Sequence, residues 1–475
     1  MKRQNGASRT HSTVYVARED REELGRLLHI TDDASDTWLW RLSEHLLFGT
    51  SFDEDTGELL LDHRTLGLLG DRSHRTGKFS AYRIVADYQV RTGVRVTLSS
   101  ANALAGKARA VAAVEFPNEV LDIAQRMRRT QLPLSGRIAL DTGEQWNPSA
   151  RRTHRLQTRE DSLEACASVE NPDAIRLLQM LNEGSSNRWA KVDGLVNDLR
   201  SAAEKLDPER REYALNVIAK IEVQPTPFFR PVERTSRIYP VGTTVLGLPR
   251  ELRKEMVRLL EWRSLDLRSA QLAIVANLWE IESLQRFLQT GQSFWMEMLN
   301  HLHLGDEEKP VIKNALYALT FGESERKSKE RFVSSFVDGG ALWGLWRSHP
   351  LISDLYRARK RVIDSYQRAG GAHDAYGKWW PVQGFHAENE SGQTYQSSNA
   401  RSVMATVAQS YELKLLSPVI DILEGGDRRV RLMFWLHDGL TVSIPENRRY
   451  VVQQMQDAVR EQAVRLGIET ELVEE

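Results

Sequence analysis

The sequence of 475 residues is poor in cysteine and has no long apolar runs. Its single cysteine, Cys166, excludes an intramolecular disulfide and a zinc site built on several cysteines, and it fits a reducing compartment. No stretch approaches the roughly 18 apolar residues of a membrane span. The N-terminal stretch MKRQNGASRTHSTVYVARED has no apolar core of signal-peptide length. We therefore expect a cytoplasmic protein with no membrane partner.

An excess of charge of either sign is also missing. The formal net charge is −1, with 41% hydrophobic and 27% charged residues, which are ordinary values for a globular protein with a real core. The length suggests about two to four domains. A chain with this balance binds nucleic acid only through locally clustered charge, because phosphate contacts depend on the local field.

One turn-rich part of the chain concentrates arginine. Two interpretations stay open, a solvated linker and a patch that contacts phosphates. The residues concerned are Arg126, Arg128, Arg129, Arg137, Arg151, Arg152, Arg155 and Arg159.

The spacing of apolar residues predicts the main elements before and after this run. Strands are expected over 12–17 and 94–100. Helices are expected over 18–30, 35–49, 101–116 and within 160–222. One of these helices should begin at Asp207-Pro208, with Asp as the cap and Pro in the first position.

Near the C-terminus, the stretch LMFWLHDGLTVSIP (residues 432–445) predicts a hairpin. Asp-Gly between apolar runs is a strong turn signal, because both residues tolerate the positive φ that the central turn positions need. His437 can then be a solvated turn residue. Alternatively, Asp438 is a metal ligand held at the end of a strand, which would require a second carboxylate elsewhere.

Asp266 is the candidate second carboxylate. It lies in a predicted strand, 262–267, and a helix is expected to start near Ser269. An acid at a strand-to-helix junction can be presented from a rigid edge, although Asp is also a common helix cap.

A third segment, EEKPVIKNALYALTFGES, places Lys309, Lys313, Tyr317 and Phe321 at four-residue intervals. This spacing aligns them on one face of a helix that should begin at Pro310. Two cations suit a triphosphate, and two aromatic rings suit a base. The alternative is a surface helix with solvated lysines.

In this order, the three segments resemble the polymerase motifs of family A DNA polymerases. Looser similarities extend the resemblance over about residues 230–475. They include RTSRIYPVGTTVLGLPRELRKEM, the segment ending in Gly377-Lys378-Trp379-Trp380, TYQSSNARSVMATVAQ and the tail GIETELVEE. The resemblance implies an α+β right-hand fold: a palm with an antiparallel sheet, helical fingers and a helical thumb, plus a small N-terminal extension of α/β type.

The domain boundaries implied are 1–135 for an N-terminal domain of unknown role and 136–230 for the thumb. The palm would comprise 231–291 and 386–475, with the fingers at 292–385. Primer-template DNA and dNTPs would be the partners.

The resemblance also implies the roles of individual residues. Two Mg²⁺ ions would be held by Asp266, Asp438 and the Leu267 carbonyl, and His437 would lie near the primer end. Lys309, Lys313, Tyr317 and Phe321 would contact the nucleotide, with Lys313 also a general acid, and Gln271 would be the steric gate against ribose. Contacts to DNA are expected from Arg237, Gln396, Arg188 and Lys191, the last two being a solvated pair in the alternative interpretation.

Four positions depart from the usual family pattern. Gly439 stands in place of Glu, Gln271 in place of Glu, Phe321 in place of Tyr and Lys309 in place of Arg. The alternatives are therefore a single-subunit RNA polymerase or primase of the same superfamily, and an inactive relative that binds primer-template. Asp20-Arg21-Glu22 matches the start of an exonuclease motif, but its surroundings predict a helix, so no proofreading is expected.

Overall fold

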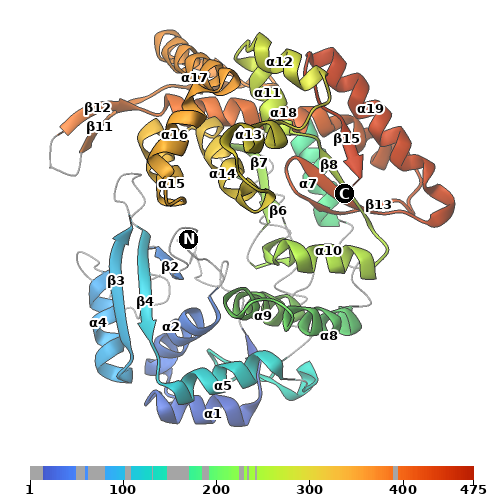
Figure 1. The fold of residues 1–475 in the computed structure, drawn as a ribbon. Helices are drawn as coiled ribbons and strands as arrows, with labels where there is room; N and C mark the ends of the chain where they lie inside the picture. Colours follow the sequence, from blue (N-terminus) through green and yellow to red (C-terminus); the bar gives the residue numbers. More distant parts are fainter. Residues whose placement is uncertain are drawn as a thin grey trace, which may run out of the picture. The chain divides into compact units, whose positions relative to one another are not determined.

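The computed structural model describes residues 14–49, 59–62, 81–101, 109–130, 132–146, 171–183, 192–223, 229–232, 235–240, 243–388 and 394–474 (Figure 1). The chain forms two compact units. Unit 1 comprises Met1–Glu164, Asn182–Phe229 and Pro240–Glu261, and unit 2 comprises Ala165–Leu181, Arg230–Tyr239 and Trp262–Glu475. These limits differ from those of the five predicted segments. The assignment of those segments to an N-terminal domain, thumb, palm and fingers stays a prediction.

Unit 1 combines helices with short antiparallel strands. Its strands are β1 (Tyr15–Val16), β2 (Leu59–Asp62), β3 (Arg95–Ala101), β4 (Arg109–Glu115) and β5 (Ile138–Ala139). Its helices are α1 (Arg18–Leu27), α2 (Thr37–Phe48), α4 (Ala81–Thr92), α5 (Asn118–Arg129), α8 (Val192–Ala203), α9 (Pro208–Val223) and α10 (Arg250–Leu259). Buried side chains of α1, α2, α4 and α5, among them Leu24, Trp40, Tyr88 and Ile123, form its core.

The helix predicted over 101–116 is wrong in the part that the structure describes. Residues 109–115 form β4, which pairs with β2 on one side and β3 on the other. Alanine favours helices in isolation, but here pairing on both edges outweighs that preference. The segment also departs from an α/β type, because β3 and β4 are antiparallel. Only seven residues separate them, too few for the crossover that parallel strands need.

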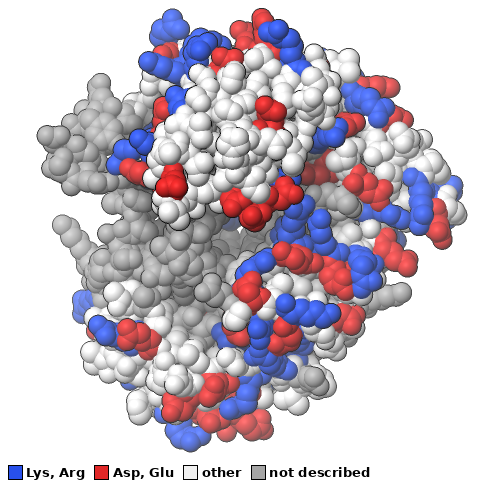
Figure 2. Space-filling model, in the orientation of Figure 1, with Lys and Arg blue, Asp and Glu red and all other residues white. Residues whose placement is uncertain are grey.

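Arginines of the basic run join the helices of unit 1. Arg126 pairs with Asp20 and Glu23 of α1. Arg128 is buried and donates to Asn216 and to the Leu47 carbonyl. Further pairs are Arg129–Glu204 and Arg137–Glu222. These four arginines are therefore structural, and the other four of the run lie outside the described residues. Figure 2 shows basic and acidic side chains intermixed over the face in view.

The predicted start of α9 is confirmed. The helix begins at Pro208, and Asp207 Oδ1 accepts a hydrogen bond from the Arg210 amide at 3.0 Å. This bond satisfies one of the amides that a helix leaves without an intrahelical partner at its N-terminus.

Unit 2 is mostly helical. Its helices are α7 (Pro172–Glu183), α11 (Ala270–Leu278), α12 (Glu282–Gln289), α13 (Phe294–Leu302), α14 (Lys309–Thr320), α15 (Glu325–Ser334), α16 (Gly339–Ser348), α17 (Pro350–Ala369), α18 (Ala400–Gly425) and α19 (Tyr450–Leu466). The part of α7 that belongs to this unit ends at Leu181. Helices α13 to α17 pack in a group in which Phe332, Trp343 and Trp346 meet.

A four-stranded antiparallel sheet organises the rest of unit 2, in the order β13 (Arg431–Trp435), β14 (Gly439–Ser443), β8 (Arg263–Leu267) and β15 (Leu472–Glu474). Three two-stranded pairings complete the strands: β6 (Phe229–Val232) with β7 (Thr235–Pro240), β9 (Gly371–His373) with β10 (Trp379–Pro381), and β11 (Gly384–Glu388) with β12 (Thr394–Ser398). Helix α19 packs against β15 and α18, and α18 also packs against α11 and α17 (Figure 1). Helices with small antiparallel sheets agree with the expected α+β class.

Candidate active site

The two predicted carboxylates meet on neighbouring strands. Strand β14 pairs with β8 so that Gly439 lies opposite Asp266, and Asp438 directly precedes Gly439. The Leu267 amide donates to the Asp438 carbonyl at 2.8 Å, which holds the two strand ends together. Leu265 and Leu267 are buried, whereas Asp266 between them is half-buried on the other face of β8. The sheet therefore presents both carboxylates from one place, although Asp438 lies 172 positions after Asp266 in the sequence.

Gly439 lies where a side chain would collide with this arrangement. A Cβ built on Gly439 would stand 2.7 Å from Asp266 Oδ1 and 2.7 Å from the Leu265 carbonyl oxygen. The carboxylate of Asp266 thus occupies the space over the glycine. This contact gives a physical reason for Gly439 at the position where the resemblance leads one to expect Glu.

The turn between β13 and β14 differs from the predicted one. The positive φ of 72° belongs to His437, whereas Gly439 already pairs in strand β14. The Asp438 amide donates to the Leu436 carbonyl, and the Leu436 amide donates to the Gly439 carbonyl. Pairing of Gly439 with Asp266 moves the turn one position toward the N-terminus, so the Asp-Gly pair is not its centre.

His437 is half-buried in the turn. Its ring centroid lies 5.0 Å from that of Tyr239, and it lines a small cavity with Arg237, Glu412 and Trp435. Burial, followed by the nearby Arg237 charge, lowers the pKa of His437 to about 3, so the ring is neutral at neutral pH. His437 therefore lies in the turn, as one interpretation predicts, but its ring is half-buried and not fully solvated.

Helix α14 presents the predicted stripe on its less buried side. Ile312, Leu316 and Leu319 form the buried face, whereas Lys313 is exposed and Tyr317 is half-buried. The Lys313 Nζ lies 5.2 Å from the centroid of the Tyr317 ring, and that ring lies 5.9 Å from the ring of Phe321. The helix begins at Lys309 with Pro310 in its first turn, as the sequence predicts.

Electrostatics links this stripe to the carboxylates. Burial raises the pKa of Tyr317, and the charges of Asp438, Asp266 and Glu412 raise it further. Geometry supports the same neighbourhood: the Arg237 guanidinium carbon lies 5.0 Å from the Phe321 ring centroid, and Arg237 lines a small cavity with His437, which directly precedes Asp438. The C-terminal end of α14 therefore lies near the turn that carries Asp438.

Arg237 connects β7 to this site through a partner that the sequence did not reveal. Its Nε and Nη2 donate to Glu412 Oε2 and Oε1 at 2.8 and 2.6 Å, and its guanidinium carbon lies 5.0 Å from the Phe321 ring centroid. Burial opposes the charge, but Glu412, Tyr239 and Asp438 outweigh it and raise the pKa of Arg237.

Three residues of the site were missed by sequence reasoning: Glu412, Gln409 and Tyr239. Glu412 is 2% exposed, and Gln409 Oε1 accepts from Thr235 Oγ1 at 2.6 Å. The available signal was a charged residue in the apolar pattern of the α18 sequence, since a buried acid generally needs a partner.

The remaining predicted site residues are either buried or outside the described part of the chain. Gln271 is 3% exposed in α11, and its side-chain amide atoms find no hydrogen-bond partner among the described residues. Gln396 lies on β12 opposite His386, and its side chain is outside the described part. Arg188 and Lys191 also lie outside it. The predicted DNA contacts of these three residues stay predictions.

The candidate ligands for Mg²⁺ are two carboxylates and a backbone carbonyl. Across the described ranges, no three His, Cys, Asp or Glu side chains come together as a metal-binding group. Magnesium does not need such a cage, because it commonly binds through one or two carboxylates and the phosphates of a substrate. Asp266, Asp438 and a backbone carbonyl fit that mode.

Among the residues that the structure describes, no helix combines the length and apolarity needed to span a bilayer.

Comparison with known proteins finds similarity in structure but no match in sequence. No family model matches the sequence, and no curated protein does. Among solved structures, the chain is similar to the POL domain of Pol1 from M. smegmatis in complex with DNA primer-template and dNTP. The identity is 12%, the alignment covers 93% of this chain and 80% of that chain, and the TM-score is 0.41.

Proposed function

We propose that this protein is a template-directed DNA polymerase that adds dNTPs to a primer 3′ end. The observation that carries the proposal is the meeting of Asp266 and Asp438 at neighbouring strand ends, together with Arg237, which lies near both His437 and the Phe321 ring of the α14 stripe. A pair of carboxylates beside a cationic helix face suits phosphoryl transfer from a nucleoside triphosphate, which requires positioning and charge neutralisation.

The carboxylates and the lysines of the site have separate proposed roles. Asp266, Asp438 and the Leu267 carbonyl would hold two Mg²⁺ ions, which would supply charge to activate the primer hydroxyl and to neutralise the triphosphate. Lys309 and Lys313 bind its phosphates, and Lys313 donates a proton to the departing pyrophosphate.

The rings of α14 position the sugar and the base. Tyr317 packs near the sugar of the incoming nucleotide, and Phe321 lies near the templating base. Arg237, held by Glu412, contacts the minor groove of the primer-template. Neutral His437 lies beside the primer end, where an uncharged ring adds no repulsion toward the Arg237 guanidinium.

We propose no proofreading activity for the described part of the chain. Asp20 lies within helix α1 and pairs with Arg126, so Asp20-Arg21-Glu22 does not lie on a strand. This arrangement supports a structural role for Asp20 in joining α1 to α5.

Primer extension on a defined template with Mg²⁺ and either dNTPs or rNTPs tests the proposal. Extension with dNTPs supports a DNA polymerase. A preference for rNTPs would favour the RNA polymerase or primase alternative, and tight primer-template binding without extension would favour the inactive relative.

Lys313→Ala is expected to slow single-nucleotide incorporation by about twentyfold, because it removes a charged donor to the triphosphate. The affinity for dNTP should fall, while that for primer-template should change little. Pre-steady-state incorporation over a range of dNTP concentrations measures both. Lys329→Ala on α15, also an exposed lysine, is the control. Weaker DNA binding with normal dNTP affinity would make α14 a duplex contact instead.

Gln271 is expected to set the choice of sugar. A neutral amide can donate to a ribose 2′-hydroxyl, so the preference for dNTPs should be weaker than with a carboxylate. Phe321 has no hydroxyl with which to accept the ribose, so dNTPs should still be preferred. Because Gln271 is buried, a nucleotide reaches it only if a neighbouring element shifts, and α14 packs against α11.

Competition between dNTPs and rNTPs on one template measures this preference. Gln271→Ala should raise the use of rNTPs relative to dNTPs, and the isosteric Gln271→Glu should lower it. If both variants kept the wild-type ratio, Gln271 would have no part in sugar selection.

A further inference from the structure

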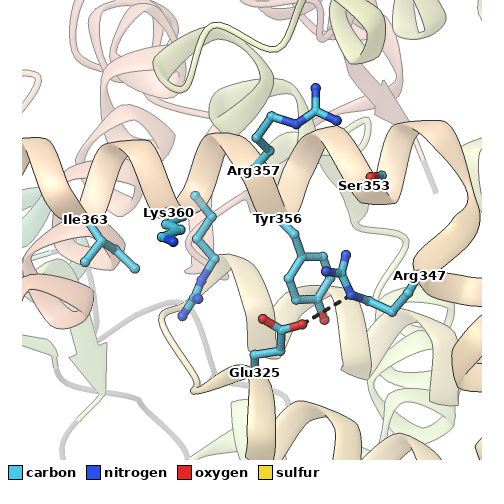
Figure 3. Close-up of a pocket in the computed structure, with 8 residues that line it drawn as sticks. Glu325, Arg347, Ser353, Tyr356, Arg357, Lys360 and Ile363 are labelled. Atoms are coloured by element: carbon cyan, nitrogen blue, oxygen red, sulfur yellow. Dashed lines mark ion pairs between the residues drawn. The ribbon is translucent and has the colours of Figure 1, made fainter.

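A second cationic site lies in unit 2, on the side of α17 that faces α15 and α16. A pocket of about 380 Å³ is lined there by Arg347, Arg357, Arg359 and Lys360, with Glu325 as its one carboxylate. Figure 3 shows Arg347 and Glu325 close together beside α17, with Lys360 further along that helix. Arg357 also pairs with Asp354 beside the pocket at 3.3 Å, so four cations and two acids leave the region with a net positive charge, within a chain whose net charge is −1.

The lining has donor capacity that the described residues do not use. Arg347 Nε pairs with Glu325 at 3.2 Å, but its Nη1 is buried without a hydrogen-bond partner among the described residues. Lys360 is exposed in the same lining. A buried guanidinium nitrogen without a partner is costly, and a small shift of the Arg347 side chain, which is 31% exposed, would let an oxygen of a bound anion satisfy it.

The pocket offers charge rather than a surface for a base. Its aromatic side chain, Tyr356, is 7% exposed, and the Arg347 guanidinium carbon lies 3.7 Å from its ring centroid. That stacking covers the ring, so the pocket is suited to a phosphate and not to a nucleobase.

Arg359 connects the pocket to the end of α14. Its Nε donates to the Leu319 carbonyl at 3.1 Å and its Nη2 to the Glu323 carbonyl at 2.5 Å. These two carbonyls flank Phe321 in sequence. Arg359, which lines the pocket, therefore also holds the backbone on both sides of Phe321, the residue expected beside the templating base.

We propose that this pocket, called here the α17 pocket, binds a backbone phosphate of the unpaired template strand as it approaches the insertion site. The inference rests on the proposed function, which runs α14 from the triphosphate at Lys309 to the templating base at Phe321. In that arrangement, the unpaired strand next to the templating base would pass near the backbone that Arg359 holds at Leu319 and Glu323. A pocket that recognises phosphate alone accepts any template sequence.

The test measures DNA binding without nucleotide or metal, so it does not depend on catalysis. Two DNAs share one duplex, one blunt and one with a long unpaired 5′ template overhang. The double variant Arg357→Gln, Lys360→Gln removes two exposed cations of the pocket. Arg460→Gln, Arg465→Gln removes the same charge from α19 and is the control.

Fluorescence anisotropy should show the pocket variant binding the overhang DNA roughly fivefold more weakly, with unchanged binding of blunt DNA. The slope of log affinity against log salt should become shallower by about 0.7 for each phosphate of the unpaired strand that the variant no longer binds. The control variant should match wild type on both DNAs.

Equal affinity of the pocket variant and wild type for the overhang DNA would overturn the proposal. So would an equal reduction of affinity for blunt DNA or in the control variant, because either would indicate a general field effect. Binding of dATP alone, abolished in the pocket variant while overhang binding persists, would assign the pocket to free nucleotides and also overturn it. Primer extension is measured separately, so its absence in wild type would reject the proposed function while the binding result stands.

Discussion

Asp266→Asn and Asp438→Asn should each lower nucleotide incorporation by about a thousandfold, with folding and primer-template affinity largely retained. Each change keeps the shape of the side chain and removes the charge that would hold Mg²⁺. In the proposed mechanism the two carboxylates would act on the same triphosphate, so the double variant should lose little more than either single variant.

Single-turnover primer extension and anisotropy binding measure the two properties separately. Asp457→Asn on α19 removes a carboxylate of unit 2 that pairs with Arg460, and it is the matched control. Incorporation within about tenfold of wild type by either site variant would reject Asp266 or Asp438 as a metal ligand.

Gly439→Ala should have the next largest effect, lowering incorporation by about a hundredfold. The new Cβ would stand 2.7 Å from Asp266 Oδ1 and equally near the Leu265 carbonyl oxygen. The side chain or the strand must then shift, and misplacement by about 1 Å is enough for a reduction of this size. The free energy of unfolding should fall by about 1–3 kcal/mol, as for other overpacked sites.

Gly344→Ala on α16 separates this effect from the general cost of changing glycine, because a Cβ there meets nothing within 4 Å. Chemical denaturation measures stability, and single-turnover extension at a temperature where both variants are folded measures activity. If Gly439→Ala were as active as Gly344→Ala, the position of Asp266 over the glycine would have no importance for the reaction.

The local elements of the site followed from short-range rules. The start of α14 at Lys309-Pro310, the strand that carries Asp266 and the hairpin at 432–445 each depend on residues within a few positions of one another. The helix expected over 101–116 was wrong because β4 is defined by two partner strands rather than by its own alanines.

The candidate residues were recognised from their order along the chain, but the sequence could not show how they meet. Glu412 was missed because its partner Arg237 lies 175 residues away. The turn was misplaced because Gly439 is drawn into a strand by pairing with Asp266. The burial of His437 likewise depends on Tyr239, a residue of another strand.

The sequence by itself determined the class of elements, the stripe of cations and rings on α14, and the pair of aspartates, because periodicity and motif spacing are properties of nearby residues. Only the tertiary structure decided that Asp266 and Asp438 meet, that Glu412 holds Arg237, and that Arg347, Arg359 and Lys360 share a pocket. These arrangements depend on contacts between residues far apart in the chain, and such contacts form only when strands pair and helices pack.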